Sequence, residues 1–566
     1  MTVNRVANKD QPDNAVEKDL ENDEELGEEV EVDRGADTAE KVIESLGEFG
    51  LFQRLLLAAC LLTELPAAGA MMLMAFAGAK SPWRCYGGNA TGMIGNDTGM
   101  ITTTVSPANV ENVTNNTMNQ CTPEGIVCPG REYTLDLSSV VTEWDLVCDQ
   151  DWIPDAISSI QMAGVVVGAF SVGQLSDLFG RKRVLYIVYF GILSGTLTSA
   201  FSVTWHMFAA LRFVVGLSLG GIMIVNISLP MEYLGKKYRV LCSGIPTWSV
   251  GSVIMALLAW QLKDWRHLSI ATAVLGFPIL FTYWFCPESI RWLIAHGRIE
   301  EAEKIIERIA KFNKREKPNI TCLLQDMKDA EEEKLLKKKK RYSYRHLFTT
   351  QEIRKHTLMM GYIWIANGLV YYGLAFGVKN LAGDRYLNLF LIGMIECVAQ
   401  PTAGFLNERI GRRKSSMGFY TLASTGSLIV LILTLAAPDQ GIVITVFAMC
   451  AWLGISGGWT AVQTMTCELF PTVVRNIGYG FCSTLARLSS IAGPQVVYIS
   501  KYFKVAPFIV CSSFTLLQVI VLIFLPETKG KPLNEFIRKP SFQHPDNKHA
   551  PKHGTDGNNH QQYTKV

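Results

Sequence analysis

Five ionisable side chains stand out within long apolar segments of this sequence: Glu64, Arg212, Glu396, Arg487 and, less deeply, Glu468. A charge in an apolar segment is costly, so each of them marks a candidate functional site by default. Arg487 lies near the middle of its segment, where its guanidinium stays charged and can bind a carboxylate through two parallel hydrogen bonds. The sequence therefore predicts a binding site for an ion that carries an anionic group.

Aromatic side chains offer a second kind of surface for such an ion. Tyr371, Tyr372, Phe376 and Trp364 share one apolar segment, and Trp248 lies in another. An aromatic face over a quaternary ammonium contributes about 0.5 to 2 kcal/mol. Aromatic residues in apolar segments more often serve packing, so the Tyr371–Tyr372 pair is the strongest of these candidates.

Two alternatives stay open for the buried charges. Glu396 or Glu64 would supply the negative charge if the bound ion were a cation. Arg487 and Glu396 would instead neutralise each other if they formed a permanent ion pair inside the protein.

Twelve apolar segments are long enough to cross a membrane, which takes about 20 residues of helix. The chain is 49% hydrophobic and 18% charged, with a mean hydropathy of +0.18, whereas a soluble protein carries about 25% charged residues. Gly216 and Gly220 follow Arg212 at intervals of four residues, which predicts a close helix contact. The pattern predicts an all-α polytopic membrane protein with transmembrane helices near 55–79, 153–175, 184–202, 205–229, 241–261, 267–285, 357–379, 384–406, 415–436, 441–463, 474–498 and 504–525.

Basic residues in the short connections predict the orientation of the chain. They gather at 181–183, 236–239 and 409–414, after the second, fourth and eighth segments, so we expect both termini to face the cytoplasm. The predicted parts are an acidic tail, an N-terminal six-helix half with an external loop, a cytoplasmic linker, a C-terminal six-helix half and a second tail. Their residues are 1–50, 51–285 with 80–152, 286–356, 357–525 and 526–566.

The predicted external loop contains four glycosylation sequons and four cysteines. Their convergence on one segment predicts an oxidising, extracellular environment and thus a multi-pass plasma-membrane glycoprotein. Four cysteines make two disulfides, and the pairing stays open among three arrangements. The residues are Asn89, Asn96, Asn112 and Asn115, and Cys85, Cys121, Cys128 and Cys148.

Charged motifs recur in the two predicted halves. The segment 173–183 returns as 404–414, 232–239 as 468–475, and 287–289 as 526–528. Three ordered repeats indicate two homologous halves. Acidic and basic residues in these loops can form pairs that break when the halves move, although a role in topology alone is the simpler alternative. The predicted gating residues are Asp177, Gly180, Arg181, Arg183, Glu232, Arg239, Glu408, Gly411, Arg412, Glu468 and Arg475.

Four motifs resemble the organic cation, carnitine and organic anion transporter family of the major facilitator superfamily: 142–148, 287–293, 468–478 and 526–530. The resemblance covers about residues 46 to 535. It implies the major facilitator fold, with a site between the two halves. In this family, cation carriers have an acidic residue at the position of Arg487, whereas carnitine and anion carriers have arginine. The resemblance therefore implies a substrate with an anionic group.

The sequence contains none of the motifs that would indicate catalysis. It has no Walker loop, no Gly-x-Ser-x-Gly and no metal-spaced Cys/His set, so we expect no enzyme activity, no cofactor and no metal site. A net charge of +2 gives no reason to expect a nucleic-acid partner. The expected partners are a small organic ion and the lipid bilayer, with the coupling ion or exchange substrate open.

The prediction is a secondary transporter that carries zwitterions, such as carnitine-like or amino-acid-derived amines, or organic anions by alternating access. One alternative is an organic cation carrier that uses Glu396 or Glu64. A second is a surface receptor on the same fold that no longer transports. A channel is disfavoured, because a duplicated bundle predicts alternating access.

Overall fold

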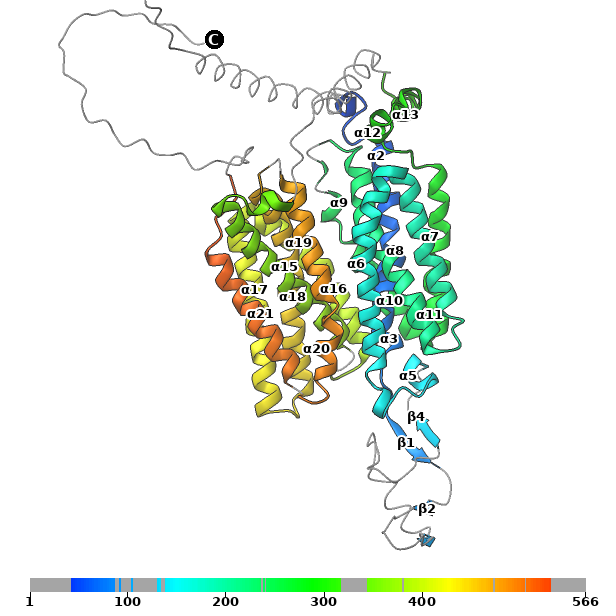
Figure 1. Cartoon of the computed structure of the whole chain (residues 1–566), viewed down its shortest axis with the longest axis vertical. Coiled ribbons are helices and arrows are strands. Elements are labelled where there is room, and N and C mark those ends of the chain that lie inside the picture. The colour runs from blue at the N-terminus through cyan, green and yellow to red at the C-terminus, as the bar shows by residue number, and fades with distance from the viewer. Residues whose placement is uncertain are drawn as a thin grey trace, which may run out of the picture.

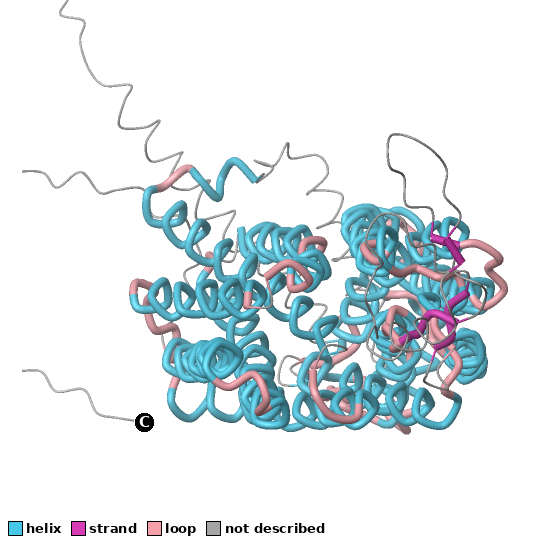
Figure 2. Tube along the Cα trace, turned by 90° about the horizontal axis from the view of Figure 1, so that it is seen from below, coloured by secondary structure: helices cyan, strands magenta, loops and turns pink. Residues whose placement is uncertain are grey.

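The computed structural model describes residues 42–86, 91–92, 103–104, 130–133, 138–235, 238–239, 241–316, 344–378, 381–471, 474–503 and 505–530. Helices dominate these residues, and they form two bundles that lie side by side (Figures 1 and 2). Each of the twelve predicted segments coincides with one helix or with two consecutive helices. The prediction of an all-helical membrane protein in two halves is confirmed.

The N-terminal half forms the first bundle. Its helices are α2 (Leu51–Leu62), α3 (Glu64–Ala77), α6 (Ile153–Phe179), α7 (Arg181–Ser199), α8 (Trp205–Met231), α9 (Leu241–Gly244), α10 (Thr247–Leu262), α11 (Trp265–Gly276) and the 3-10 helix η3 (Phe277–Trp284).

The C-terminal half forms the second bundle. Its helices are α15 (Gln351–Gly377), α16 (Arg385–Ile410), α17 (Arg412–Ala436), α18 (Gly441–Leu469), α19 (Arg475–Ser490), α20 (Gly493–Ile499) and α21 (Ala506–Ile523).

Short elements mark the two ends of the bundles (Figure 1). One end, called the strand end, carries the antiparallel strands β1 (Trp83–Tyr86) and β4 (Gly130–Tyr133), the pair β2 (Thr91–Gly92) and β3 (Thr103–Thr104), helix α5 (Val140–Glu143) and η1 (Cys148–Gln150). The other end, called the linker end, carries α12 (Ile290–Ala295), α13 (Ile299–Phe312) and η4 (Tyr344–Phe348).

Several predicted segments are interrupted. The first breaks at Thr63, and the eleventh breaks between Ser490 and Gly493. The fifth breaks before Thr247, because Pro246 has no backbone N–H and its ring excludes a continuous helix. Within the described residues, nine helices are long and apolar enough to cross a membrane. α10 and α19 have 16 residues each and fall below that length.

Glycines bring α6 and α8 into close contact. A Cβ on Gly216 would lie 2.1 Å from the carbonyl oxygen of Gln161, and one on Gly220 would lie 2.1 Å from that of Val165. Such overlap with backbone atoms leaves room only for glycine. The packing stripe predicted after Arg212 is therefore confirmed.

The two halves meet through the part of the bundle nearer the strand end. The Ser159 hydroxyl of α6 donates to the Ile491 carbonyl at 2.8 Å, and the Gln495 amide donates to Ser159 at 3.1 Å. Lys501 pairs with Asp151 at 2.8 Å across the same junction. These contacts join the two halves near the strand end.

Candidate functional site

Arg487 lies in the last turn of α19. Its guanidinium donates to the Ser483 hydroxyl at 2.5 Å and lies beside Tyr372 and Tyr479. Within the described residues, no carboxylate lies within ion-pair distance of it. The alternative of a permanent Arg487–Glu396 pair is therefore wrong for this conformation, and Arg487 keeps donors available for a ligand.

Glu396 lies in α16 and is 2% exposed. Its carboxylate accepts a hydrogen bond of 2.6 Å from the Tyr371 hydroxyl, and Ser249 of the other half lies beside it. No basic side chain among the described residues pairs with it. A negative charge on Glu396 thus has only hydroxyl groups around it.

The tyrosine pair lies between these two charges. Tyr371 contacts Glu396, whereas Tyr372 lies beside Arg487, and the two rings meet edge to face at 5.1 Å. Both tyrosines are half-buried. A carboxylate, an aromatic face and a guanidinium are therefore contributed by three helices of the C-terminal half, α16, α15 and α19.

The other predicted aromatic residues differ in their surroundings. Trp364 is buried and donates to the Thr466 hydroxyl at 3.0 Å, and Phe376 is buried near Tyr372. Both belong to the core. Trp248 projects from the N-terminal half and lies beside the Tyr371 hydroxyl.

Two tryptophans of α18 belong to the same aromatic surface. The Tyr371 ring lies 4.7 Å from Trp452 and 5.5 Å from Trp459, and Tyr479 lies 5.2 Å from Trp364. The sequence prediction missed all three. Trp452 and Trp459 lie two helical turns apart in the sequence, which puts them on one helix face and would have signalled them.

Glu64 is the first residue of α3. Its carboxylate accepts from the Asn226 amide at 2.9 Å and from the Thr247 hydroxyl. Asn226 also belongs to a glycosylation sequon, but it is buried within α8. The structure thus places Glu64 in a polar cluster of the N-terminal half.

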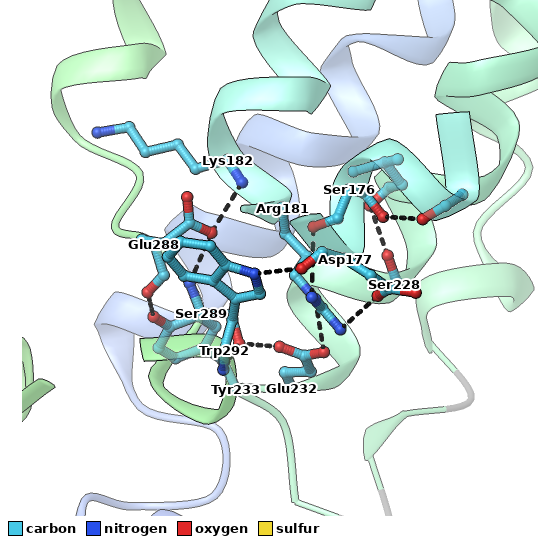
Figure 3. Close-up of polar contacts among 12 residues, drawn as sticks. Ser176, Asp177, Arg181, Lys182, Ser228, Glu232, Tyr233, Glu288, Ser289 and Trp292 are labelled. Atoms are coloured by element: carbon cyan, nitrogen blue, oxygen red, sulfur yellow. Dashed lines mark hydrogen bonds and ion pairs between the residues drawn. The ribbon is translucent and has the colours of Figure 1, made fainter. Parts of the chain in front are cut away.

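A charge cluster occupies the linker end of the N-terminal half (Figure 3). Arg181 pairs with Asp177 at 3.0 Å and with Glu232 at 3.2 Å, and the Trp292 indole donates to the Asp177 carbonyl at 2.7 Å. Glu288 accepts from the backbone N–H of Lys182 at 3.0 Å. The cluster joins three helices and the α12 segment within one half.

The C-terminal half repeats this cluster. Arg412 pairs with Glu408 at 2.8 Å and with Glu468 at 2.9 Å, and Thr528 donates to Glu468 at 2.6 Å. Glu527 takes the place of Glu288 and accepts from the backbone N–H of Arg412 at 2.8 Å. Each cluster therefore connects residues of its own half.

Two carboxylates that the sequence prediction left without a role cap helices in these clusters. Gly180 and Gly411 have φ values of 100° and 104°, and a Cβ on either would overlap Glu288 or Glu527. Burial alone would raise the pKa of Glu527, but the backbone N–H groups of Lys529, Arg413 and Arg412 hold it below its usual value. Both glutamates bind helix N-termini, where a negative charge is favoured.

Three further predicted gating residues occupy different places at the linker end. Arg183 is exposed. Arg239 donates to the carbonyl oxygens of Met231 and Leu234 and so binds the end of α8. Arg475 begins α19.

The predicted external sites fall mostly outside the described side chains. Asn89, Asn96, Asn112, Asn115, Cys121 and Cys128 lie outside the described residues, as does the side chain of Cys85. Cys148 is disulfide-bonded, and its pairing stays a prediction. Within the described ranges, no group of three or more His, Cys, Asp or Glu side chains is placed to share a metal ion.

Known proteins resemble both the sequence and the fold. The family model described as sugar (and other) transporter matches residues 90–539. The chain is 36% identical over 414 residues to organic cation/carnitine transporter 2 of Homo sapiens, which covers 72% of this chain and 73% of that protein. It is 31% identical over 530 residues to the organic cation transporter-like protein of Drosophila melanogaster, covering 88% and 91%.

Solved structures share the fold at low sequence identity. The inward open conformation of the xylose transporter XylE from E. coli aligns with a TM-score of 0.58 and 14% identity, covering 85% of this chain and 98% of that one. The proton:xylose symporter XylE bound to 6-bromo-6-deoxy-D-glucose aligns with a TM-score of 0.56 and 16% identity, with the same coverage.

Proposed function

The chain belongs to the solute carrier 22 family of organic cation and carnitine transporters within the major facilitator superfamily, and from this membership we propose that it carries zwitterionic or anionic small organic ions across the plasma membrane. The observation that carries the proposal is the state of Arg487. Its guanidinium has a single hydroxyl partner, no carboxylate among the described residues, and two tyrosines beside it. A substrate carboxylate supplies the missing charge.

The other end of a zwitterion binds at the aromatic surface. An ammonium group that lies against Tyr371 and Trp459 gains the attraction of the rings and of the Glu396 carboxylate behind Tyr371. The Tyr371 hydroxyl already donates a hydrogen bond to Glu396. This bond orients the Tyr371 ring before the substrate arrives. A substrate with carboxylate and ammonium groups then spans from α19 to α16.

Transport proceeds by alternating access in this proposal. The linker end faces the cytoplasm, as the basic connections predict, and the strand end lies outside. The present contacts join the two halves near the strand end, whereas the ion pairs of the linker end stay within each half. Rocking of the halves breaks the Ser159 and Asp151 contacts and opens the site outward.

The linker-end clusters keep each half rigid during this motion. Arg181 and Arg412 each connect the end of one helix to the acidic residue of another. When the halves rock, these loops approach each other, so their geometry decides how the linker end closes. The sequence predicted that the pairs of Asp177, Glu232, Glu408 and Glu468 break when the halves move. In this proposal they stay paired with the two arginines, because each pair lies within one half.

A competition panel tests the substrate class. Uptake of tetraethylammonium, carnitine and p-aminohippurate is measured in cells that express the chain, with and without Arg487→Ala, at matched surface abundance. We expect selective loss of the two substrates that carry a carboxylate. Undiminished uptake of all three by Arg487→Ala would show that Arg487 does not bind the substrate.

A second candidate function is an organic cation carrier that uses Glu396. The absence of a basic partner for Glu396 within the described residues favours it, and Drosophila relatives are named organic cation transporters. Glu64 suits this role less well, because its two oxygens already accept hydrogen bonds. Tetraethylammonium uptake that Glu396→Gln abolishes and Arg487→Ala leaves intact would support this candidate. A chain that takes up none of the three probes would instead favour the receptor alternative.

A further inference from the structure

The Glu64 carboxylate is saturated by neutral donors from two other helices. One oxygen accepts from Asn226 of α8 at 2.9 Å, and the other accepts from the Thr247 hydroxyl of α10. Asn226 is oriented in turn by the Thr63 hydroxyl at 3.2 Å. Among the described residues, no basic side chain pairs with Glu64. These contacts give Glu64 a local partner set that a substrate would have to displace.

Helix α10 needs an acceptor at the position where Glu64 lies. The helix begins at Thr247 within the predicted fifth membrane segment, and Pro246 contributes no side-chain cap. The first backbone N–H groups of a helix have no partner inside the helix, and its N-terminus favours a negative charge. The hydroxyl of Thr247, the first residue of α10, donates to the Glu64 carboxylate. Glu64 therefore caps α10 from a neighbouring helix.

The capped turn is also the part of the N-terminal half that reaches the proposed site. Trp248 lies beside the Tyr371 hydroxyl, and Ser249 lies beside the Glu396 carboxylate. Helix α16 approaches closely here, because a Cβ on Gly393 would lie 2.7 Å from a methyl carbon of Val253. Three consecutive residues thus connect Glu64 in one half with Tyr371 and Glu396 in the other.

We propose that Glu64 is a positioning residue for substrate binding. It holds the start of α10 so that Trp248 and Ser249 complete the site on the side of the N-terminal half, and its oxygens accept hydrogen bonds from the helix start rather than bind the substrate. This inference rests on the proposed site around Tyr371 and Glu396. It separates the two acidic candidates, because Glu396 lies at the site and Glu64 acts through α10.

The experiment compares variants of the cap in the full-length chain. Surface abundance, KM and maximal rate are measured for whichever of carnitine, tetraethylammonium and p-aminohippurate the unmodified chain transports. Glu64→Gln keeps an acceptor oxygen, whereas Glu64→Ala removes it. Thr247→Val removes the hydroxyl donor, whereas Thr247→Ser keeps it. Asp439→Asn, at an exposed position between α17 and α18, is the matched control.

We expect Glu64→Ala to raise KM about tenfold for every transported probe, which is the contribution of a hydrogen bond to a charged group. Glu64→Gln should change KM less than about twofold because it keeps the acceptor. Thr247→Val should raise KM in the same direction, and Thr247→Ser should restore it. Asp439→Asn should change neither KM nor the maximal rate.

Two results would overturn the proposal. If Glu64→Gln and Glu64→Ala both abolish uptake of cation-bearing probes alone, Glu64 is a counter-ion of the substrate. If Glu64→Ala leaves KM unchanged, the cap does not position the site. If Glu64→Ala does not reach the cell surface, Thr247→Val and Thr247→Ser provide the test instead: an unchanged KM for Thr247→Val would overturn the proposal. A failure of the proposed Arg487 role can be distinguished from a failure of this inference. Arg487→Ala is judged by which probes lose uptake, whereas the Glu64 variants are judged by whether KM changes equally for all probes.

Discussion

Each half of the molecule has an arginine within a membrane-spanning helix, Arg212 in α8 and Arg487 in α19, and the two guanidinium groups have different surroundings. Arg212 in the N-terminal half is fully buried; it donates to the Gln161 amide oxygen at 2.6 and 3.0 Å and also to the Ala70 carbonyl. Arg487 in the C-terminal half is half-buried and donates to Ser483. The same residue type thus organises helices in one half and keeps donors available in the other.

The difference shows how a duplicated scaffold acquires one substrate site. The linker-end clusters are nearly the same in the two halves, with Arg181 and Arg412 in equivalent pairs. The centres are unlike each other, because the aromatic surface and the Arg487–Glu396 arrangement belong to the C-terminal half. We infer that the repeated loops serve the motion that both halves share, and that substrate preference comes mainly from one half.

Replacing each arginine by methionine tests this comparison with the largest expected effect. Arg212→Met leaves the Gln161 and Ala70 oxygens without donors and should cost about 3 kcal/mol of folding stability. Arg487→Met should leave stability within about 0.5 kcal/mol and abolish uptake of carboxylate-bearing substrates. Thermal unfolding of the purified chain and uptake at matched surface abundance measure the two effects. Equal destabilisation by both changes would contradict the comparison.

Glycine substitutions near the two arginines provide a second test of the difference between the two halves. A Cβ on Gly216 would lie 2.1 Å from the Gln161 carbonyl, and one on Gly368 would lie 2.2 Å from the Ala486 carbonyl. Each alanine variant should cost about 1–3 kcal/mol through overpacking, which unfolding measures. Gly368→Ala should in addition raise KM, because it displaces α19 next to Arg487.

The controls for this pair are Gly173→Ala and Gly404→Ala, which occupy repeated positions with no atom within 4 Å of the added Cβ. Neither should alter stability or KM. If KM rises for Gly216→Ala but not for Gly368→Ala, our proposal has placed the substrate site in the wrong half.

The linker-end arginines should respond alike. Arg181→Ala and Arg412→Ala each remove two ion pairs of the same kind. Each should lower the maximal rate about fivefold to tenfold and leave KM nearly unchanged. This size corresponds to the lower end of the coupling free energies found between linked conformational changes. Asp439→Asn, at an exposed position, serves as the control. A loss in one half alone would show that the repeated clusters have separate functions.

The smallest effect is expected at the strand end. The hydrogen bond to Asp151 raises the pKa of Lys501, so the pair contributes fully below the ordinary lysine pKa of about 10.4 and is lost only as pH rises above it. The Lys501–Asp151 pair should therefore not make the transport rate depend on pH in the neutral range. Asp151→Asn should alter the maximal rate less than about threefold. A strong pH dependence in the neutral range that Asp151→Asn removes would contradict this expectation.

Hydropathy and charge predicted most of the scaffold, because a membrane imposes strong rules on sequence. A helix satisfies its backbone groups internally in hydrocarbon, and about 20 apolar residues suffice to span it; all twelve predicted segments coincide with helices. The repeated motifs identified the loop residues that pair at the linker end. The breaks at Thr63 and before Thr247 were missed, since a hydropathy average continues through a short interruption.

The centre was harder to predict, because pairing depends on which helix faces meet. The sequence offered Arg487 and Glu396 as partners, yet Tyr371 and Tyr372 lie between them. Trp452 and Trp459 were missed because the prediction considered aromatic residues only in the fifth and seventh segments. Glu288 and Glu527 stand in motifs that were recognised, but their capping role depends on helices distant in sequence.

The sequence alone determined the helical membrane architecture, its duplication and the residue types available at the centre, since these follow from local composition and repeated spacing. The tertiary structure decided which charges are used up within the protein. Arg212 is fully buried, with two of its three guanidinium nitrogens bonded to neighbours from other helices, and both Glu64 oxygens accept hydrogen bonds. Arg487 is only half-buried and bonds one hydroxyl among the described residues. That distinction arises from helix packing in three dimensions, which residue types and spacing along one chain do not specify.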